Sequence, residues 1–576
     1  MNPKEIFEKW LAKTDLEVDL KDELLKIKDN EEEIKSRFGS YLEFGTAGLR
    51  GLMGAGTNRM NVYTIRHATQ GFADFISSKG DVAKNKGVVI AYDSRNNSSL
   101  FAYESAKVLA ANGIKVYIFN SLRPTPLLSF AVRYLQCTAG INITASHNPK
   151  EYNGYKAYGS DGAQLSPEHA SAVMNYISKN DLFDDVKYID FNDGLKTEII
   201  SIISDEVDSA YKKAVIEQSV NPELTRQKGS EIKIIYTPFH GAGYNLVPDI
   251  LKTAGFTNLE TVKEQMTLDG NFPTVITPNP SDTRGFDLAI KQALSSGGDL
   301  IIGTDPDADR IVALAKNKEG EFKPFTGNQM GCLLISYLID AKKSKGQLVG
   351  KYAVVKSIVS TYLADEICKA NGIDVINVLT GFKYIGEQIN KFYETGSHNF
   401  LLGFEESCGY LTGNYARDKD AVLGSLLISE MALYYREKGL SLWDVMESIY
   451  EKYGCFSDET VDITITGLDA SEKIKEIVAD IRQNTPNEIN GTKVIEITDL
   501  KTGLIKSLND GSTSKSLLPS ANVLIFKLED NSTIVIRPSG TEPKIKLYFY
   551  VISENLEKAY EKIQNYKKSL KAKMNL

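Results

Sequence analysis

Short apolar runs alternate with longer amphipathic stretches along most of the chain. The first set leads from 87–92 through 114–119 to 139–143, and the second leads from 232–236 to 299–302. Each set begins with a strand-like run and ends on another run that is followed at once by a polar loop. Strands that alternate with helical stretches predict βαβ units with largely parallel sheets.

A third set repeats this pattern further along the chain, from 352–355 through 375–379 to 399–402. The weak internal repeat therefore predicts three similar mixed α/β/α domains. Ligands bind beyond the carboxyl ends of the strands in open α/β sheets, so each domain is expected to contribute one polar loop to a site.

The pattern changes after about residue 450. A start resembling a capping box predicts a helix over 441–454, and it is followed by strand-like runs at 461–465 and 522–528. The second run leads through a four-residue turn into the strand-like run 533–536, which is a hairpin signal. With a last helix over 556–571, this part predicts a C-terminal α+β domain with an antiparallel sheet.

The same pattern suggests where the domains begin and end. Residues 1–20 mix charged and apolar residues without a long apolar core, which predicts an amphipathic helix and not a signal peptide. The stretches 210–227 and 316–324 are the plausible boundaries. We therefore expect four domains, at 1–209, 210–322, 323–452 and 453–576.

Composition excludes several classes of protein. A chain of 576 residues is too long for one core, and 42% apolar and 25% charged residues are ordinary for a globular enzyme. A net charge of -8 and a pI near 5.5 argue against nucleic-acid binding. The five cysteines lack CxxC spacing, which indicates a reducing compartment. The sequence contains no run of 18 apolar residues, which is the length expected of a membrane span. We expect a cytoplasmic protein, as a monomer or weak homodimer.

The polar loop after 139–143 carries a candidate nucleophile. It reads TASHNP, which places the small hydroxyl of Ser146 at the end of a buried strand. By itself this is weak evidence, because a serine beside a histidine in a loop is more often a turn residue or a helix cap.

The loop after 299–302 carries a candidate metal site. It reads GTDPDADR, so that Asp305, Asp307 and Asp309 occupy alternate positions on a short turn. Three such carboxylates repel one another unless a divalent cation lies among them, and an all-oxygen ligand set favours Mg²⁺. The pattern lacks the glycine and glutamate of an EF-hand loop, and a solvated turn rich in aspartate is the competing interpretation.

A loop in the C-terminal part is suited to bind phosphate. It reads RPSGTEPK, and it brings the cations Arg537 and Lys544 close to a run of small polar residues, Ser539, Gly540 and Thr541. The glycine lets backbone amides approach a ligand, and cations with hydroxyls supply what a phosphate dianion needs. A surface turn with charged residues is the alternative.

Four motifs in this order, TASHNP, GTDPDADR, GFEES and RPSGTEPK, resemble the active-site loops of the α-D-phosphohexomutase superfamily, which contains the phosphoglucomutases and phosphomannomutases. The resemblance covers almost the whole chain. The segment FGTAGLRG at 44–51 is similar to the branch that holds the longer bacterial α-phosphoglucomutases and the animal phosphopentomutase. The resemblance to this superfamily implies an active site in a central cleft, where the loops of all four domains meet.

The resemblance implies a phosphoserine enzyme. Ser146 would carry the phosphoryl group and complete a Mg²⁺ shell with the three aspartates. The enzyme would phosphorylate glucose 1-phosphate to glucose 1,6-bisphosphate, which would turn round and return its other phosphate to the serine. Lys156 and His147 are both candidates for proton transfer, the first with a pKa lowered by the metal and Arg50. A hydrogen bond that fixes the loop is an equal alternative for His147. Arg50 resembles the family's N-terminal active-site arginine.

The other loops are assigned through the same resemblance. Glu405 and Ser407 look like the pair that hydrogen-bonds two sugar hydroxyls, and Arg310 is expected to face the substrate. Further substrate contacts are expected from the segment that contains Thr380, Gly381 and Lys383. Residues of the fourth loop would bind the second phosphate: Arg537, Ser539, Gly540, Thr541 and Lys544.

Two further pairs of residues are assigned a role. Asp93 and Arg95 are expected to be structural supports. Arg417 and Lys419 are candidates for the phosphate end of the substrate, with a surface salt bridge as an equal alternative.

Several other functions are compatible with these motifs. Within the mutases, ribose, deoxyribose or mannose phosphates compete with glucose phosphate as the substrate. A metal-dependent sugar-phosphate phosphatase would share the phosphoserine step. A catalytically silent binding protein would be expected to lack Ser146 or one of the aspartates, yet all are present.

Overall fold

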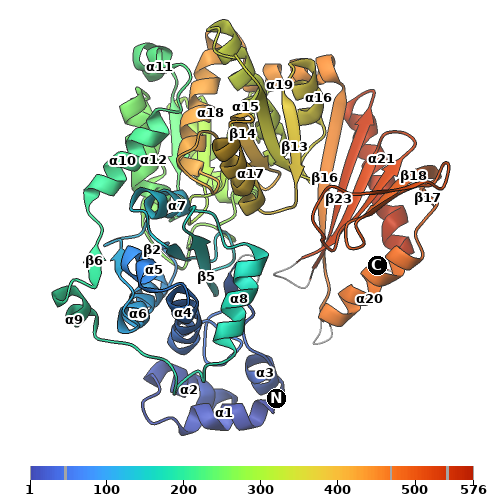
Figure 1. The fold of residues 1–576 in the computed structure, drawn as a ribbon. Coiled ribbons are helices and arrows are strands. Elements are labelled where there is room, and N and C mark those ends of the chain that lie inside the picture. The colour runs from blue at the N-terminus through green and yellow to red at the C-terminus, as the bar shows by residue number, and fades with distance from the viewer. Residues whose placement is uncertain (1, 45–47, 467–469, 540–543, 575) are drawn as a thin grey trace. The chain divides into compact units, whose positions relative to one another are not determined.

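The computed structural model describes residues 2–44, 48–466, 470–539, 544–574 and 576 (Figure 1). Its residues divide into two compact units. The first contains Met1–Thr326, Gly386–Gly396 and Ser407–Glu437, and the second contains Gly327–Ile385, Ser397–Glu406 and Lys438–Leu576. We describe each unit by itself.

The first unit opens with three helices that pack round Trp10: α1 (Pro3–Ala12), α2 (Val18–Ile27) and α3 (Glu31–Phe38). The single helix predicted over 1–20 is wrong, because the chain turns after Ala12 so that Leu16 is buried. The Tyr63 hydroxyl holds this turn by donating to the carbonyl oxygen of Asp15 at 3.2 Å.

The first sheet has the order β1-β5-β4-β2-β3-β6. Its strands are β1 (Leu49–Leu52), β2 (Val88–Tyr92), β3 (Val116–Ile118), β4 (Ala139–Ile143), β5 (Tyr152–Gly159) and β6 (Ile200–Ile202). Strands β2, β3, β4 and β6 run parallel, β5 is antiparallel to β4 at one edge, and β1 is antiparallel to β5. The helices of this region are α4 (Val62–Ser77), α5 (Asp81–Lys86), α6 (Ser98–Ala111), α7 (Thr125–Tyr134), α8 (Pro167–Ile177) and α9 (Phe191–Lys196).

The second sheet of this unit has the order β11-β10-β9-β7-β8. Strands β7 (Ile234–Thr237), β8 (Leu259–Thr261) and β9 (Leu300–Thr304) are parallel. Strand β10 (Ile311–Lys316) is antiparallel to β9, and β11 (Phe322–Pro324) is antiparallel to β10. The surrounding α-helices are α10 (Asp205–Ile216), α11 (Pro222–Lys228), α12 (Gly243–Ala254), α13 (Lys263–Met266), α14 (Asp287–Ser296) and α18 (Ala421–Arg436). Short 3₁₀ turns cover Gly229–Glu231 and Thr283–Phe286, and strand β15 covers Gly409–Leu411.

The second unit begins with a parallel sheet in which β12 (Tyr352–Ser357) lies between β13 (Asp374–Val378) and β14 (Asn399–Glu405). Its helices are α15 (Gly327–Ser344), α16 (Leu363–Ala370), the start of α17 (Phe382–Thr395) and α19 (Leu442–Tyr453). Ser441 caps α19 in a capping box with Asp444, as the sequence predicted. The prediction of three α/β/α domains with largely parallel sheets is confirmed.

The C-terminal part of the second unit is an antiparallel sheet in the order β16-β23-β22-β21-β18-β19-β20. These strands are β16 (Cys455–Thr464), β18 (Thr492–Asp499), β19 (Leu504–Ser507), β20 (Thr513–Lys515), β21 (Leu524–Leu528), β22 (Thr533–Pro538) and β23 (Lys544–Ser553), and the short β17 (Glu488–Ile489) pairs with β18. Helices α20 (Ala470–Gln483) and α21 (Leu556–Lys573) complete this domain. The predicted α+β domain and its hairpin are confirmed.

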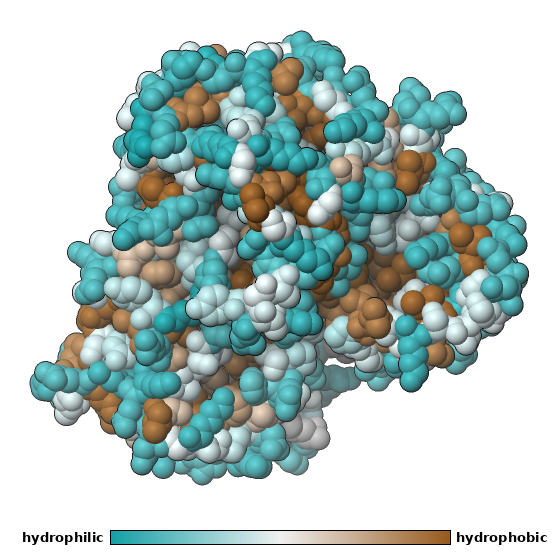
Figure 2. All heavy atoms as spheres, turned by 45° about the horizontal axis from the view of Figure 1, so that its top comes forward, coloured by the Kyte–Doolittle hydropathy of each residue, from teal (hydrophilic) through white to brown (hydrophobic). Residues whose placement is uncertain are grey.

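Apolar side chains on the face drawn in Figure 2 lie in small groups among hydrophilic ones. Within the described part of the chain, we find no helix whose length and hydropathy would suit a membrane span.

Candidate active site and metal centre

Ser146 lies on the loop that leaves the end of β4. This strand pairs with parallel β2 on one side and with antiparallel β5 on the other, so the loop begins at the carboxyl edge of the sheet. The Ser146 backbone has φ of 54°, and only 2% of the residue is exposed. A non-glycine residue pays for this left-handed conformation, so the surrounding loop must hold it in place.

Arg95 and Asp93 supply that support. The Arg95 guanidinium donates to four loop carbonyls, those of Ser146, Asn148, Pro149 and Tyr152.

Asp93 forms an ion pair with this guanidinium, with one carboxylate oxygen 3.3 Å from Arg95 Nε. The same oxygen accepts from Thr144 Oγ1 at 2.6 Å, and Thr144 Oγ1 accepts in turn from the backbone N–H of Ser146 at 2.8 Å. The two residues are therefore structural supports, as expected, and both are buried.

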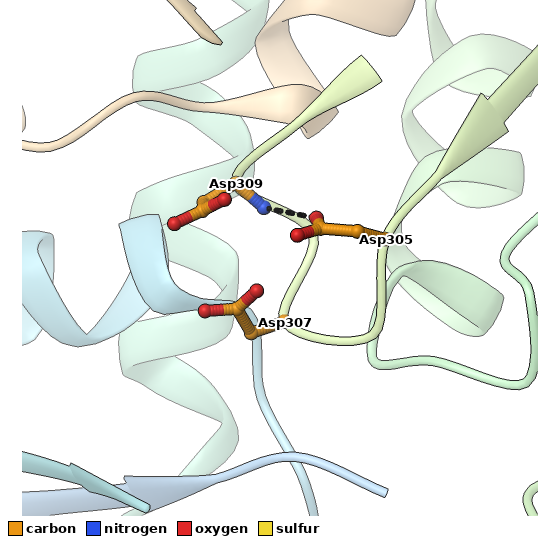
Figure 3. Close-up of side chains that lie close together, drawn as sticks. All are labelled: Asp305, Asp307 and Asp309. Atoms are coloured by element: carbon orange, nitrogen blue, oxygen red, sulfur yellow. Dashed lines mark hydrogen bonds between the residues drawn. The ribbon is translucent and has the colours of Figure 1, made fainter. Parts of the chain in front are cut away.

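The aspartate loop turns between β9 and β10. The backbone N–H groups of Asp309 and Arg310 donate to Asp305 Oδ1, at 3.1 and 3.0 Å. One carboxylate oxygen of each of Asp305, Asp307 and Asp309 lies within 4.8 Å of the others, and all three side chains are buried. Figure 3 shows the three carboxylates round a common space.

The donor set fits a divalent cation. Asp307 Oδ1 and Asp309 Oδ1 are buried and have no hydrogen-bond partner among the described residues. Burial, followed by the charges of Asp307 and Asp309, raises the pKa of Asp305 well above its ordinary value. Buried carboxylate oxygens without donors are costly, and a hard cation removes both that cost and the repulsion.

The two loops meet at the serine hydroxyl. Ser146 Oγ donates to Asp305 Oδ2 at 3.0 Å and lies 3.2 Å from His147 Nδ1. The candidate nucleophile thus contacts a candidate metal ligand from a loop 159 residues away. Sequence reasoning named both groups, and the structure brings them together.

Two lysines balance the charge of the cluster. Lys156 Nζ, on β5, lies 2.8 Å from Asp307 Oδ2 and 3.4 Å from Asp309 Oδ2. Lys419 Nζ lies 2.9 Å from Asp309 Oδ2. Burial opposes the charged form of Lys156, yet the carboxylates of Asp307 and Asp309 keep its pKa above the ordinary value. These anionic contacts raise the pKa of Lys156, and the lowered pKa expected beside a bound metal ion stays a prediction.

The pKa of His147 is shifted in the opposite direction from that of Lys156. Burial, and then the positive charges of Arg310 and Arg50, hold its pKa well below the ordinary value, so the imidazole is neutral. Arg50 lies on β1, where Nη1 donates to Asn148 Oδ1 at 3.0 Å. Arg310 Nε lies 3.9 Å from Asp309 Oδ1. Both arginines therefore lie beside the Ser146 and aspartate loops.

Arg417 differs from expectation. It is 1% exposed, and its guanidinium donates to the carbonyls of Asn414 and Ala416 and to the side chains of Asn390 and Asn414. These bonds fix a buried turn, so the surface salt bridge is wrong, and the phosphate contact stays a prediction. Its neighbour Lys419 is the residue of this segment that reaches the aspartates.

The proposed sugar-binding residues lie mainly in the second unit. Glu405 is buried at the end of β14, and its Oε1 accepts from the backbone N–H of Gly381 at 2.7 Å. Thr380 Oγ1 is buried without a hydrogen-bond partner among the described residues, and Lys383 Nζ lies 5.2 Å from the centre of the Tyr384 ring. Ser407 is the residue at which the chain re-enters the first unit.

The proposed phosphate loop joins β22 to β23. Arg537 pairs with Lys546 in the sheet, and the Ser539 N–H donates to the carbonyl of Lys544 at 2.8 Å. This bond brings the two ends of the loop together. Gly540 and Thr541 lie outside the described residues.

Sequence reasoning missed Thr125, the first residue of α7. Its Oγ1 donates to Asp307 Oδ2 at 2.8 Å, and its backbone N–H donates to the Asp307 carbonyl at 2.9 Å. No local signal marks this residue, because its partner is 182 positions away. Only its place at a helix start, after a proline, was visible in the sequence.

Comparison with known proteins then places the chain in a family. Three family models match in succession: phosphoglucomutase/phosphomannomutase alpha/beta/alpha domain I over 41–184, domain II over 209–320 and domain III over 326–453. The chain belongs to the phosphoglucomutase/phosphomannomutase family.

Relatives in this family match over nearly their whole length. Phosphoglucomutase of Staphylococcus haemolyticus is 38% identical over 534 residues, which are 92% of this chain and 94% of that protein. Phosphoglucomutase of Staphylococcus aureus strain MSSA476 is also 38% identical, over 92% of this chain and 93% of its own.

Solved structures share the fold. A putative phosphomannomutase from Thermus thermophilus superposes with a TM-score of 0.68 at 21% identity, over 93% of this chain and all of that one. The open form of parafusin, a phosphoglucomutase from Paramecium, gives 0.67 at 18% identity, over 93% and 96% of the two chains.

Proposed function

We propose that this protein is a phosphoglucomutase that interconverts α-D-glucose 1-phosphate and glucose 6-phosphate. The reaction would pass through phosphorylated Ser146 and a glucose 1,6-bisphosphate intermediate. The observation that carries the proposal is the contact between Ser146 Oγ and Asp305 Oδ2, at 3.0 Å, within a buried cluster of three aspartates. This is the arrangement that phosphoryl transfer needs, a nucleophile beside a centre that can neutralise the group in transit.

The proposal includes a Mg²⁺ site made of Asp305, Asp307, Asp309 and Ser146. Its support is the pair of buried carboxylate oxygens without a hydrogen-bond donor among the described residues, together with an all-oxygen donor set. Mg²⁺ bound there would neutralise charge on the phosphoryl group.

The side chains near Ser146 would accept and donate protons during phosphoryl transfer. His147 Nδ1 lies 3.2 Å from Ser146 Oγ, and its lowered pKa keeps it neutral, so it can accept a proton. Lys156 lies 2.8 Å from Asp307 Oδ2, and its ammonium can neutralise negative charge on the phosphoryl group or exchange a proton with the substrate hydroxyl. Arg50 and Arg310 would add positive charge where phosphate oxygens lie.

Substrate recognition in this proposal comes from the other loops. Glu405 and Ser407 would hydrogen-bond sugar hydroxyls, with Thr380, Gly381, Lys383 and Arg310 near them. The second phosphate would be bound by the loop that contains Arg537, Ser539, Gly540, Thr541 and Lys544. We assign phosphoserine, metal-binding, sugar-binding and phosphate-binding domains to 1–209, 210–322, 323–452 and 453–576.

Assays of several sugar phosphates test this assignment. Glucose, mannose, ribose and deoxyribose 1-phosphates would be compared at equal concentration, each with Mg²⁺ and a catalytic amount of glucose 1,6-bisphosphate. We expect the highest kcat/KM with glucose 1-phosphate, because a carboxylate and a hydroxyl at positions 405 and 407 suit vicinal hexose hydroxyls.

Other outcomes point to other functions. Equal or greater efficiency with either pentose phosphate would contradict the glucose assignment and favour a phosphopentomutase. Release of inorganic phosphate without formation of glucose 6-phosphate would favour a phosphatase.

A further inference from the structure

Asp307 is held by a chain of hydrogen bonds that begins in the first sheet. Asn142 lies on β4, four residues before Ser146, and its Nδ2 donates to Thr125 Oγ1 at 2.6 Å. Thr125 Oγ1 donates to Asp307 Oδ2 at 2.8 Å. All three residues are fully buried, at 0% exposure.

The direction of this chain follows from the number of protons. A threonine hydroxyl carries one proton, and the Asp307 carboxylate can only accept. The proton of Thr125 goes to Asp307, so the Thr125 oxygen can only accept from Asn142. The side-chain atom of Asn142 beside that oxygen is therefore the amide nitrogen. Asn142 Oδ1 is left without a partner among the described residues. A buried amide oxygen without a donor costs free energy, so a packing role alone does not account for this arrangement.

The hydrogen bonds from Thr125 also make the two carboxylate oxygens of Asp307 different from each other. Oδ2 accepts from Thr125 and is 2.8 Å from Lys156 Nζ, whereas Oδ1 has no partner among the described residues. The Thr125 N–H fixes the Asp307 backbone as well, at 2.9 Å from its carbonyl oxygen. One residue thus fixes both the backbone and the rotamer of Asp307, and leaves Oδ1 pointing away from its protein donors.

We propose that Thr125, oriented by Asn142, is a positioning residue that presents Asp307 Oδ1 to the divalent cation. The inference rests on the metal site of the proposed function. Groups that orient a metal ligand typically change metal affinity by about 10- to 100-fold when they are removed. A threonine that only begins α7 would affect stability and leave that affinity unchanged.

Binding of Mn²⁺ to the full-length protein tests this role without any assay of activity. Free Mn²⁺ would be measured by electron paramagnetic resonance during titration of the wild type, Thr125→Val and Thr125→Ser. Valine matches the shape of threonine but lacks its hydroxyl, so we expect affinity to fall by about 10-fold or more. Serine keeps the hydroxyl, and we expect its affinity to stay within about threefold of the wild type.

A matched control is Thr69→Val in the same unit. Thr69 is also fully buried, and its Oγ1 donates to the Ile65 carbonyl at 2.7 Å, on helix α4, which carries none of the three metal-site aspartates. We expect this variant to bind Mn²⁺ as the wild type does, even though it loses a buried hydrogen bond.

Each outcome decides between two claims. Wild-type affinity in a folded Thr125→Val variant would overturn the positioning role while leaving the metal site intact. If the wild type itself binds no Mn²⁺, the proposed metal site is wrong and the inference falls with it. If Thr125→Val does not fold, Asn142→Leu removes the orienting amide and keeps the hydroxyl. Unchanged Mn²⁺ affinity in that variant would contradict the proposal, and a severalfold loss would support it.

Discussion

At the scale of single residues, the site depends on a few side chains that hold loops in costly conformations. Ser146 has a positive φ, and Arg95 bonds four carbonyls of the surrounding loop. A planar guanidinium offers five donors in a fixed arrangement, which a lysine ammonium does not reproduce. Arg95 therefore acts on catalysis through the loop that carries Ser146.

Arg95→Lys tests this dependence. Lysine keeps the charge beside Asp93, but its single nitrogen cannot serve four carbonyls in this geometry. With two or three buried hydrogen bonds lost, we expect the free energy of unfolding to fall by about 2–3 kcal/mol. We expect kcat to fall at least about 10-fold, because Ser146 is displaced. Denaturant titration and the mutase assay measure the two effects.

The matched control for this substitution is Arg226→Lys. Arg226 forms an exposed ion pair with Glu223 in the same unit, so its replacement should change stability by less than about 0.5 kcal/mol. Full activity in a stable Arg95→Lys protein would show that the loop does not need the guanidinium.

The sequence predicted the candidate site unevenly, for a physical reason. Ser146 and the three aspartates are visible because each group lies within one short motif. Thr125 and the burial of Arg417 were not visible, because their contacts join segments that only the fold brings together. The carboxylate contacts of Lys156 were not visible either, because the motif alone does not contain Asp307 and Asp309.

At the scale of elements, β5 separates two strands of the first sheet that lead to site residues. It lies between β1, which carries Arg50, and β4, which leads to Ser146. Gly154 on β5 is crowded by backbone, since a Cβ there would lie 2.5 Å from the Thr144 carbonyl oxygen and 2.9 Å from that of Leu49. Neither atom can move without moving its strand.

Gly154→Ala should therefore push β1 and β4 away from β5. We expect a loss of about 1–3 kcal/mol in the free energy of unfolding and a fall in activity, since both flanking strands lead to site residues. Gly159→Ala, at the end of the same strand, is the matched control. Its new Cβ would lie 3.1 Å from a side-chain oxygen of Asp161 and 4.0 Å from the Ala163 carbonyl oxygen, so we expect a smaller loss than at Gly154. Thermal unfolding and activity of the two variants provide the comparison, and equal stability would refute the crowding argument.

Element prediction succeeded where hydrophobic period and turn chemistry agree. The strands that end at the Ser146 and aspartate loops were found because each is a continuous buried run, as parallel strands are. The N-terminal helix was predicted too long, because Leu16 is buried by a turn that depends on Tyr63, a residue far along the chain.

At the scale of the molecule, the chain forms two units, and stability can be tested in each. In the second unit, Asp458 on β16 accepts from Asn328 Nδ2 on α15 at 2.6 Å. Burial raises the pKa of Asp458 to about 6, and the Asn328 bond only partly offsets it. The charged carboxylate is therefore a cost to the fold, absent below about pH 4 and complete above about pH 6.

Asp458→Asn should remove this cost and keep an acceptor for Asn328. Relative to the wild type, we expect the variant to gain about 1–2 kcal/mol as the pH rises from 4 to 7, because the side chain is partly exposed and the full shift is damped. Asp29→Asn, which replaces an exposed carboxylate, serves as the control. Thermal unfolding across this pH range measures the difference, and a gain that shrinks with rising pH would contradict the sign.

The central claim for the whole molecule is that Ser146 carries phosphate through each catalytic cycle. Mass analysis of the peptide that contains Ser146, after incubation of the enzyme with Mg²⁺ and glucose 1,6-bisphosphate, tests it most directly. We predict one phosphoryl group on Ser146 in the wild type, its transfer to added glucose 1-phosphate, and neither phosphate nor mutase activity in Ser146→Ala. An active enzyme whose Ser146 is never phosphorylated, or an active Ser146→Ala variant, would contradict the account.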